Sequence, residues 1–389
     1  MKDIVIVAGA RTPMAEYNGH FSDVSAIDLG AIAAKAALER SGFAPEEIDH
    51  VIVGNALQTS GDAIYGARHV GLKAGVPKHV PALTLNRLCG SGIQSIISAA
   101  EQIELDEATT VLAGGMENMS QAPYVIRGAR KGLRLGQAPM EDSLMVALLD
   151  SYCGLYMAQT SDNLARKYEI SREAQDAYAL QSQQRAGAAA RDCRLSEEIV
   201  PVPVGRKGEQ IKTDDHLRPD TTMEGLAKLK PAFAKDGFVT AGNASGIVDG
   251  AAMVTVTTAE NARSKKPLGR IVSWGITGCD PDIMGIGPVP ATKIALKRAG
   301  LKLDDIDLIE INEAFAGQIL AVVKELGIDQ SKLNVNGGAI ALGHPLAASG
   351  TRLVLTVLYE LRRRKAKYGL ASACIGGGQG IAMIVESLA

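Results

Sequence analysis

The chain has 389 residues, 46% hydrophobic and 22% charged, a balance typical of a folded protein with two or three packed domains. Its 41 Lys and Arg residues nearly balance 43 Asp and Glu residues, which argues against nucleic acid as the main partner, because nucleic-acid binding normally demands a basic surface. The sequence contains no uninterrupted apolar run of about 18 residues, so we expect no membrane span.

The five cysteines are spread along the chain and include no Cys-x-x-Cys pair. We therefore expect neither a zinc ribbon nor a thioredoxin-type redox site, and no metal site is predicted. Reduced thiols are typical of cytosolic proteins, so the expected location is cytoplasmic. The first apolar run is too short for the core of a signal peptide.

The most informative feature is an internal repeat, in which residues 36–49 resemble residues 294–307. Each copy predicts an amphipathic helix that ends at a glycine, Gly42 or Gly300, followed by an acidic turn and a buried strand. The copies are 258 residues apart, because position 307 matches position 49.

The same offset relates other segments. Ser91-Gly92 matches Ser349-Gly350, and each pair is predicted to open a helix. Leu112-Ala113 matches Leu370-Ala371. Three segments in one register indicate a duplicated α/β unit. Because strands alternate with helices in each half, we predict an α/β fold with mostly parallel sheets flanked by helices.

A third segment interrupts this alternation between the two halves. Residues 120–245 are neither Pro/Ser-rich nor of low complexity, so they are interpreted as an inserted loop domain rather than a flexible linker. The predicted N-terminal half comprises residues 1–119 and returns at 246–265, and the predicted C-terminal half comprises residues 266–389.

Cys89 lies in a motif, Asn86-Arg87-Leu88-Cys89-Gly90-Ser91-Gly92, between a predicted strand and a predicted helix. The start of a helix offers free N–H groups and a partial positive charge, which favour a thiolate. We therefore predict a lowered pKa and a nucleophilic role for Cys89. A buried structural cysteine stays open as the alternative on this motif alone.

His344 lies just before the position that is equivalent to Cys89 in the second half, within Asn336–Pro345. If the halves pack about a pseudo-twofold axis, both helix starts point to the centre and His344 can reach Cys89. A neutral imidazole can take the thiol proton. The alternative is a hydrogen-bonded core histidine.

Two more motifs complete the candidate site. Cys374 precedes a glycine loop between two predicted strands, and N–H groups in such a loop can form an oxyanion hole. The alternative is a simple glycine hairpin. Asn312 ends the repeated strand of the second half, where α/β sheets place ligands, although a turn residue or helix cap stays open.

Together these motifs resemble the thiolase family along the whole chain. The resemblance implies two thiolase halves, an inserted loop domain that binds CoA, dimers that often pair into tetramers, and reversible two-step Claisen chemistry. The segments that carry it are Asn86–Gly92, Gly114–Glu117, Thr240–Gly246, Asn312–Phe315, Gly343–Pro345 and Cys374–Gly378.

The resemblance also implies a role for each catalytic residue. Cys89 would be the acylated nucleophile, His344 its activator, and Cys374 the acid/base for the second substrate. The N–H groups of Cys89 and Gly376 would hold the oxyanion in the acyl-enzyme step. In the condensation step His344 and a water on Asn312 would do so. CoA and acyl-CoA are implied as substrates, with no tightly bound cofactor.

Other residues are implied to contact the substrate. Ser245 would contact the pantetheine arm, and Arg218 would lie near the nucleotide. The acyl pocket would be lined by bulky side chains beside Cys89, which predicts a preference for short acyl chains. The remaining predicted contacts are Ala241, Tyr156, Met157, Met284 and Phe315.

Three positions differ from the usual family pattern. Ala347 follows Gly-His-Pro-Leu where the family usually has glycine, Asn118 replaces a serine, and Tyr156 replaces the histidine of short-chain members. None of these changes removes a catalytic group. The change at Tyr156 bears on substrate choice.

The predicted activity is reversible CoA-dependent acyl transfer by a ping-pong mechanism through acyl-Cys89. It either joins two acetyl-CoA molecules or cleaves short 3-ketoacyl-CoA. One alternative is a decarboxylating ketoacyl synthase, whose sites pair one cysteine with two histidines, or with a histidine and an asparagine. Another is a non-catalytic acyl-CoA- or lipid-binding relative, which would lack the acid/base groups.

Overall fold

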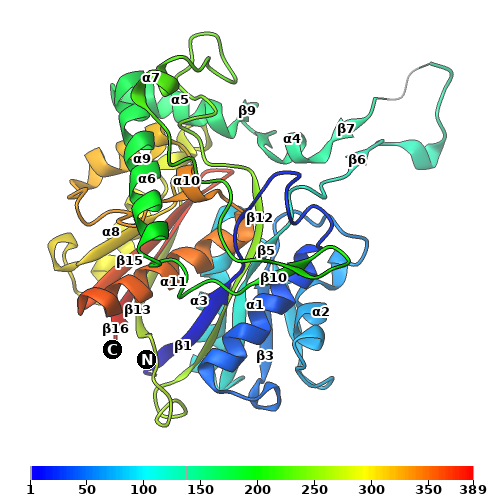
Figure 1. Cartoon of the computed structure of the whole chain (residues 1–389), viewed down its shortest axis with the longest axis vertical. Coiled ribbons are helices and arrows are strands. Elements are labelled where there is room, and N and C mark those ends of the chain that lie inside the picture. Colours follow the sequence, from blue (N-terminus) through cyan, green and yellow to red (C-terminus); the bar gives the residue numbers. More distant parts are fainter. Residues whose placement is uncertain (1, 137–138, 389) are drawn as a thin grey trace.

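The computed structural model describes residues 2–136 and 139–388, and its centre is one large sheet (Figure 1). The strand order is β14-β15-β16-β13-β1-β12-β5-β3-β4, with β2 (Ala15–Glu16) paired to β12. The strands on this path are β1 Ile4–Arg11, β3 His50–Gly54, β4 Ala82–Leu85, β5 Thr110–Glu117, β12 Val248–Thr258, β13 Gly269–Gly278, β14 Leu308–Ile311, β15 Tyr368–Ile375 and β16 Gln379–Ser387.

The helices outside the insertion form three layers around this sheet. The central pair, α3 and α11, packs together and contacts strands of both halves, whereas α1 packs on β1 and β12 and α8 packs on β13 and β16. These helices are α1 Ala26–Ser41, α2 Gly66–Lys73, α3 Ser91–Glu104, α8 Pro288–Ala299, α9 Ala316–Leu326, α10 Ala339–Leu342 and α11 Leu346–Arg364.

The strand order confirms the duplication and the α/β class. The strand order is the same in both halves when each is read from the edge of the sheet toward its centre. The first half has the order β3-β5-β12-β1, and the second half has the equivalent order β14-β15-β16-β13. The pairing is mixed: β3 with β4 and β5, and β14 with β15, are parallel, while the long strands between them pair antiparallel. The short turn between β15 and β16 imposes one of these antiparallel pairs.

The predicted helix ends hold in both copies. Gly42 ends α1 with φ 67° and Gly300 ends α8 with φ 68°, a left-handed conformation that favours glycine. In the second half α11 begins at Leu346, about one turn before the predicted start at Ser349. Pro345 precedes that first turn with its fixed φ of −71°, so the chain already enters the helix there.

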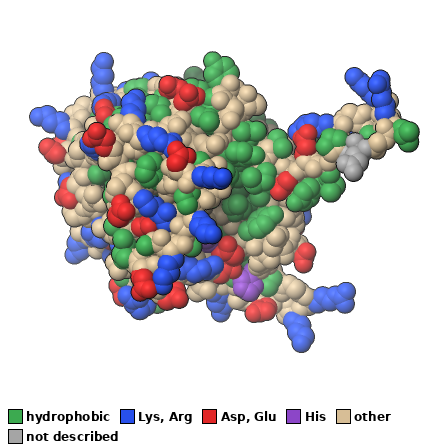
Figure 2. Space-filling model, turned by 90° about the horizontal axis from the view of Figure 1, so that it is seen from above, with side chains coloured by type: hydrophobic (Ala, Val, Ile, Leu, Met, Phe, Trp, Pro, Cys, Tyr) green, Lys and Arg blue, Asp and Glu red, His purple; other side chains and the backbone are tan. Residues whose placement is uncertain are grey.

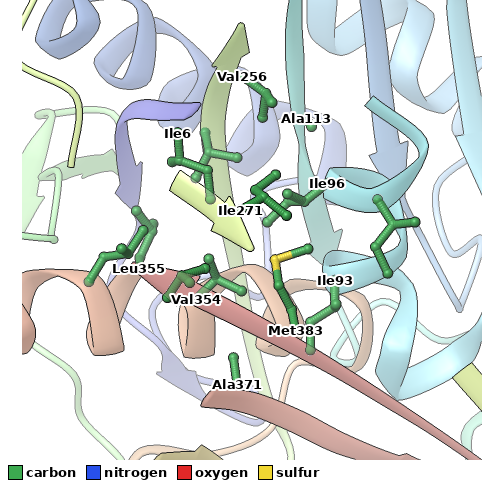
Figure 3. Packing of buried hydrophobic residues seen from close by; sticks show 14 of the residues in the cluster. Ile6, Ile93, Ile96, Ala113, Val256, Ile271, Val354, Leu355, Ala371 and Met383 are labelled. Atoms are coloured by element: carbon green, nitrogen blue, oxygen red, sulfur yellow. The ribbon is translucent and has the colours of Figure 1, made fainter. Parts of the chain in front are cut away.

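The central core fills the space between the sheet and the middle helices (Figure 3). The predicted apolar face of α3 is fully buried in it, including Ile93 and Ile96, and meets Val354 and Leu355 of α11 and Met383 of β16. Burying one such side chain contributes roughly 1.5–3 kcal/mol, so this contact fixes how the halves sit together.

The helices α3 and α11 approach most closely at two glycines related by the repeat. A Cβ at Gly92 would lie 2.4 Å from the backbone N of Thr351, and a Cβ at Gly350 would lie 2.5 Å from that of Ile93. Only glycine permits such an approach. The starts of both helices therefore meet at the centre, as the pseudo-twofold arrangement predicted.

The insertion occupies one connection of the first half. It begins after β5, which ends at Glu117, and the chain returns at β12. In the second half the equivalent strands, β15 and β16, are joined only by the short turn Gly376–Gly378. Its domain boundaries, 120–245, stay a prediction. Its elements are β6 Tyr124–Val125, β7 Glu141–Asp142, α4 Ser143–Ala147, β8 Leu149–Asp150, β9 Leu155–Tyr156, α5 Met157–Lys167, α6 Arg172–Arg191, β10 Val202–Val204, β11 Glu209–Ile211 and α7 Met223–Ala227.

Part of the insertion projects from the body. The strands β6 and β7 form an extended arm (Figure 1), and hydrophobic side chains gather where this arm joins the rest of the molecule (Figure 2). Within residues 2–136 and 139–388, no helix has both the length and the apolar character needed to cross a membrane.

Candidate active site

A cavity of about 280 Å³ lies where the two central helices begin and is lined by both halves and the insertion. Its openings are flanked by α4 and β8. Of the residues predicted from the sequence, this cavity brings together Cys89, His344, Cys374, Gly376, Ser245, Met157, Met284 and Phe315.

A tight turn before α3 holds Cys89. Leu88 has φ 46°, a left-handed conformation that is uncommon outside glycine and is retained at sites where a residue must be aimed. The hydroxyl of Ser91 donates to the carbonyl of Leu88 at 2.7 Å and accepts from the N–H of Arg87 at 2.9 Å. These bonds fix the backbone on both sides of the thiol.

The predicted lowering of the Cys89 pKa is wrong for the unliganded site. Burial raises the pKa of this thiol to about 11, while hydrogen bonds from the backbone at Gly376 and at Cys89 itself act in the opposite direction, and the Glu117 charge raises it further. Desolvation outweighs the helix start because the thiol lies inside the cavity. Cys89 is therefore protonated near neutral pH and requires a base.

His344 provides a neutral imidazole. Burial lowers its pKa to about 3, and the positive charge of Arg352 acts in the same direction. Its Nδ1 lies 2.5 Å from Oγ of Ser349 and its Nε2 lies 3.3 Å from Nδ2 of Asn312. Its backbone N–H donates to the carbonyl of Gly246, just after the predicted end of the insertion, at 2.9 Å. The ring is thus held at both nitrogens and uncharged.

Asn312 reaches the site through His344 and does not line the cavity itself. It follows β14, and its backbone N–H donates to Ser372 of β15 at 2.9 Å. Its Oδ1 is buried and has no hydrogen-bond partner among the described residues. A buried acceptor of this kind is available to a water or substrate group.

Cys374 and the glycine loop form the wall opposite the helix starts. Cys374 is 1% exposed, and burial together with the neighbouring Cys89 and Cys279 raises its pKa well above the ordinary value. The predicted strand–glycine–strand hairpin is confirmed, with φ 80° at both Gly377 and Gly378. A Cβ at Gly376 would press on Leu88 and Met157 at 3.3 Å, so glycine keeps this position open.

Two further cavities extend from the first. A mostly apolar one of about 280 Å³ shares Ser245 with the first and includes Ala241. A third, of about 490 Å³, shares Ala241 and is lined by Arg218 and His216. The three cavities therefore adjoin one another in series, as a track of cavities from Cys89 to the predicted nucleotide end.

Tyr156 does not line the cavity that holds Cys89. It lines the adjoining one, where its ring packs against Phe233 with centroids 5.4 Å apart. Tyr156 has extended backbone just before α5, while Met157 is the first residue of that helix, so their side chains diverge. Tyr156 was expected among the residues that line the acyl pocket beside Cys89, and the structure places it in the adjoining cavity instead.

Arg218 stands at the rim of the third cavity. Its guanidinium donates to Glu16 at 3.1 Å and to the carbonyl of Asp215 at 3.1 Å, and it is about half exposed. Glu16 also accepts from His216, with the Nδ1–Oε2 pair at 2.6 Å. Because the side chain is only partly engaged, Arg218 is available to an anionic ligand.

Two residues that the sequence analysis named only as parts of the repeat and of a family segment prove to act at the site. Ser349 contacts His344, as described above. Glu117 is fully buried and accepts from the N–H groups of Leu57 at 2.8 Å and Ala347 at 3.0 Å, and burial raises its pKa to about 7. An acidic residue that ends an apolar strand was the available signal for Glu117.

The two remaining departures from the family pattern fit without disruption. The amide of Asn118 donates to the carbonyls of Phe21 and Val24 at 2.9 and 2.7 Å. Ala347 is fully buried, and its carbonyl lies so close to Gly115 that a Cβ there would meet it at 1.9 Å. Both residues are buried and pack against neighbouring backbone without lining the cavity that holds Cys89.

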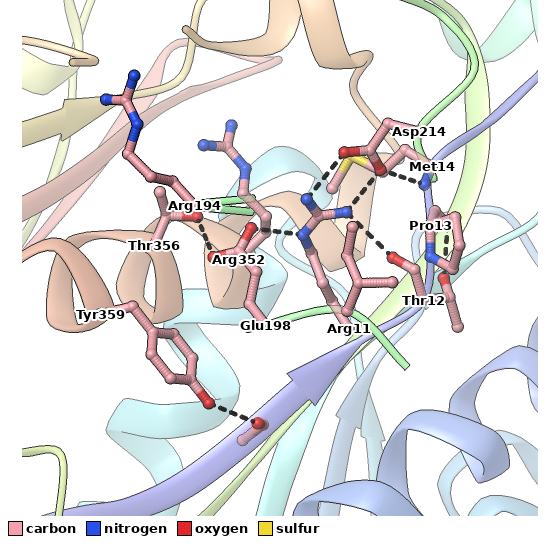
Figure 4. A network of polar contacts seen from close by, with 12 residues as sticks. Arg11, Thr12, Pro13, Met14, Arg194, Glu198, Asp214, Arg352, Thr356 and Tyr359 are labelled. Carbon is pink, nitrogen blue, oxygen red and sulfur yellow. Dashed lines mark hydrogen bonds and ion pairs between the residues drawn. The ribbon is translucent and has the colours of Figure 1, made fainter. Parts of the chain in front are cut away.

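A buried network of charges lies behind the site (Figure 4). Arg11 pairs with Glu198 at 2.6 Å and with Asp214 at 2.6 Å, which ties β1 to the insertion. Arg352 pairs with Glu310 at 2.9 Å, and both side chains are almost wholly buried. The Arg352 charge is the one that disfavours protonation of the catalytic imidazole.

Comparison with known proteins identifies the family. The family model described as "Thiolase, N-terminal domain" matches residues 4–260, and "Thiolase, C-terminal domain" matches residues 265–387. The chain belongs to the thiolase family. The resemblance inferred from the motifs is confirmed, and it extends over nearly the whole thiolase chain.

Individual relatives are similar along their full lengths. The chain is 55% identical to the human protein named "3-ketoacyl-CoA thiolase, mitochondrial" over 394 residues, covering 100% of this thiolase and 99% of that protein. It is 50% identical to the "Acetyl-CoA acetyltransferase" of Cupriavidus necator, covering 99% and 100%. A crystal structure of human mitochondrial 3-ketoacyl-CoA thiolase in complex with CoA matches with TM-score 0.97 and 54% identity, covering 99% and 98%.

Proposed function

We propose that this thiolase is an acyltransferase that cleaves 3-ketoacyl-CoA with CoA, and runs the reverse condensation of acetyl-CoA, through an acyl group on Cys89. One observation carries the proposal. A single cavity unites two protonated thiols, the partly exposed Cys89 and the buried Cys374, with a neutral imidazole at His344 and the open glycine loop. Those groups are the nucleophile, acid and base that thiolytic cleavage requires.

The first step of cleavage transfers the acyl group to the enzyme. Nε2 of His344 takes the proton of Cys89 as its sulfur attacks the 3-keto carbon. The oxyanion is held by the N–H groups of Cys89 and Gly376. The bond between C2 and C3 then breaks and leaves the enolate of acetyl-CoA. Cys374 protonates C2 of that enolate and becomes a thiolate.

The second step releases the acyl group to CoA. The Cys374 thiolate takes the proton of the CoA thiol, whose sulfur attacks the acyl carbon on Cys89. The carbon–sulfur bond to Cys89 breaks, and the leaving thiolate recovers its proton from His344. Every group returns to its starting protonation state. Condensation is the reverse sequence, because each step is a balanced transfer.

Asn312 belongs to the step in which the enolate exists. Its buried Oδ1 has no partner among the described residues, so it can accept from a water that in turn donates to the enolate oxygen. Nε2 of His344, protonated at that stage, supplies the second donor from the same side. Two hydrogen-bond donors directed at the enolate oxygen stabilise its negative charge more strongly in a cavity that excludes water than they would in water.

The track of three cavities supports an extended CoA thioester. Arg218 lines the third cavity, where we expect it to hold phosphate, and Ala241 and Ser245 line the second cavity, which we propose as the route of the pantetheine arm. Met157 and Phe315 line both of the inner cavities and guide the thioester toward Cys89. A CoA complex exists for the similar human protein.

Short acyl chains are the proposed substrates. The cavity around Cys89 measures about 280 Å³, just below the roughly 300–1,000 Å³ of common ligand sites, and Met284 and Met157 fill part of its wall. One methylene in an apolar pocket changes specificity by about 1–3 kcal/mol, so the preference is graded. The test is kcat/KM for thiolysis across four- to sixteen-carbon 3-ketoacyl-CoAs. A maximum at eight carbons or beyond contradicts this preference.

The activity itself is tested by thiolysis of acetoacetyl-CoA, with Cys89→Ala as the inactive control. Acid quench and peptide mass mapping after acetyl-CoA should find the acetyl group on Cys89 alone. A decarboxylating ketoacyl synthase would instead require malonyl thioesters, and a non-catalytic binding protein would turn over neither. An acetyl group on Cys374, or none at all, contradicts the assignment.

Assembly and location are also proposals. We expect a homodimer or homotetramer, because β4 lies at the edge of the sheet with Leu83 exposed, and the nearby residues Ile64 and Tyr65 are exposed as well. Light scattering of the purified chain tests this. The cytoplasmic location stays a prediction, and the similar proteins include mitochondrial and bacterial ones.

A further inference from the structure

Ser349 is a buried hydroxyl that contacts the catalytic imidazole from behind. Its Oγ lies 2.5 Å from Nδ1 of His344, on the side of the ring away from Asn312. The same Oγ donates to the carbonyl of Pro345 at 3.0 Å. Both Ser349 and Asn312 are fully buried, so no bulk solvent replaces either partner.

The hydrogens in this cluster can be placed by counting donors. A serine hydroxyl has one proton and two lone pairs. Because the proton of Ser349 goes to Pro345, Oγ faces Nδ1 with a lone pair, and Nδ1 must carry the hydrogen. Nε2 then carries the lone pair, which faces Nδ2 of Asn312 at 3.3 Å and can take the thiol proton. One tautomer of His344 satisfies every contact.

The repeat shows that this contact is particular to the second half. Ser91 is the counterpart of Ser349, and its hydroxyl donates to Leu88 and accepts from the N–H of Arg87. The first serine therefore completes the turn that carries Cys89. The second serine has exchanged its backbone donor for an imidazole.

We infer that Ser349 is a positioning residue that fixes His344 in the Nδ1-protonated tautomer and so keeps the basic Nε2 directed toward Asn312 and the cavity. The inference rests on the proposed role of His344 as the base. After His344 takes the thiol proton, the same contact holds Nδ1–H of the imidazolium, so the ring need not turn between accepting a proton and donating a hydrogen bond. A wrong tautomer at a comparable histidine in serine proteases costs about 10⁴-fold in kcat.

The first measurement is independent of activity. Nitrogen-15 NMR of the free enzyme at pH 7, with His344→Asn used to assign the signal, should show Nδ1 bearing hydrogen and Nε2 without it. In Ser349→Ala the two forms should both be populated. If Nε2 carries the hydrogen in the unaltered enzyme, the inference is overturned even where thiolysis is normal.

The second measurement is kinetic. Ser349→Ala should lower kcat for acetoacetyl-CoA thiolysis by about 10- to 100-fold with little change in KM, and Ser349→Thr should restore it to within a few-fold. Ser95→Ala is the matched control, since it also removes a buried hydroxyl bonded to a helix carbonyl, that of Gly92 at 2.8 Å. Equal losses in the Ser95 and Ser349 variants, or no rescue by threonine, overturn the inference.

If Ser349→Ala fails to fold, the tautomer in the unaltered enzyme and the threonine variant still decide the matter. If the enzyme proves inactive toward all 3-ketoacyl-CoAs yet shows the expected tautomer, the proposed function fails and the hydrogen-bond assignment stands. The two measurements therefore distinguish a failure of the proposed thiolase activity from a failure of the proposed role of Ser349.

Discussion

The close approach of α3 and α11 makes Gly92→Ala an informative perturbation. An alanine in a helix normally gains up to about 1 kcal/mol over glycine. Here the new Cβ would lie 2.4 Å from the backbone N of Thr351 and 2.8 Å from the carbonyl of Ala347. Ordinary contact begins near 3.4 Å, so the helices must separate by about 1 Å. Backbone atoms cannot rotate away, and overpacking of this kind costs about 3 kcal/mol, which leaves a net loss of about 2 kcal/mol.

That separation of the helices also moves Cys89 away from His344, because Cys89 precedes α3 and His344 precedes α11. A misplacement of 1 Å can reduce a rate about 10²-fold, so kcat for thiolysis should fall by that order while the protein still folds. Thermal melting and steady-state kinetics measure both effects. Gly61→Ala is the control, since nothing lies within 4 Å of its added Cβ. A Gly92 variant that melts no lower than the unaltered protein and keeps its kcat refutes the reasoning.

Three further predictions follow from the site. Cys374→Ala should still form acyl-Cys89 from acetyl-CoA, seen by intact mass, while its turnover falls about 10²–10⁴-fold; loss of the acyl-enzyme instead would reverse the assigned roles. Because burial raises the pKa of Cys89 to about 11, the thiolate fraction should grow about tenfold per pH unit. Inactivation of the free enzyme by iodoacetamide should therefore keep accelerating from pH 7 to 9, and a plateau below pH 8 would contradict the burial argument. Arg218→Ala should raise KM for CoA at low salt and lose that effect at high salt, and leave KM for a pantetheine thioester unchanged; an unchanged KM for CoA removes Arg218 from the nucleotide site.

Much of the architecture could be predicted from the sequence because the same helix–turn–strand pattern occurs twice in the chain. The glycines that end α1 and α8 and the strands β3 and β14 were predicted from the repeat, and each copy supports the other. The meeting of Cys89 and His344 followed from the same register. Local signals in two copies fix long-range contacts that one copy leaves open.

The properties that escaped prediction depend on surroundings rather than on spacing. The pKa of Cys89 is set by how much water the assembled cavity excludes, which no local motif reports. The contact of Ser349 with His344 depends on side-chain directions within one helical turn. Tyr156 and Met157 are adjacent in sequence, yet only Met157 reaches the cavity that holds Cys89, because a helix begins between them.

The place where the insertion enters the sheet has a consequence for how the insertion can change. Glu117 and Gly250 are direct partners in neighbouring strands, so the segment leaves and rejoins the scaffold at one spot. Lengthening a loop whose ends already meet costs only about 0.6 kcal/mol per doubling. The segment between those two partners can therefore change in length at little cost in free energy, while Cys89, His344 and Cys374 remain on the scaffold outside it.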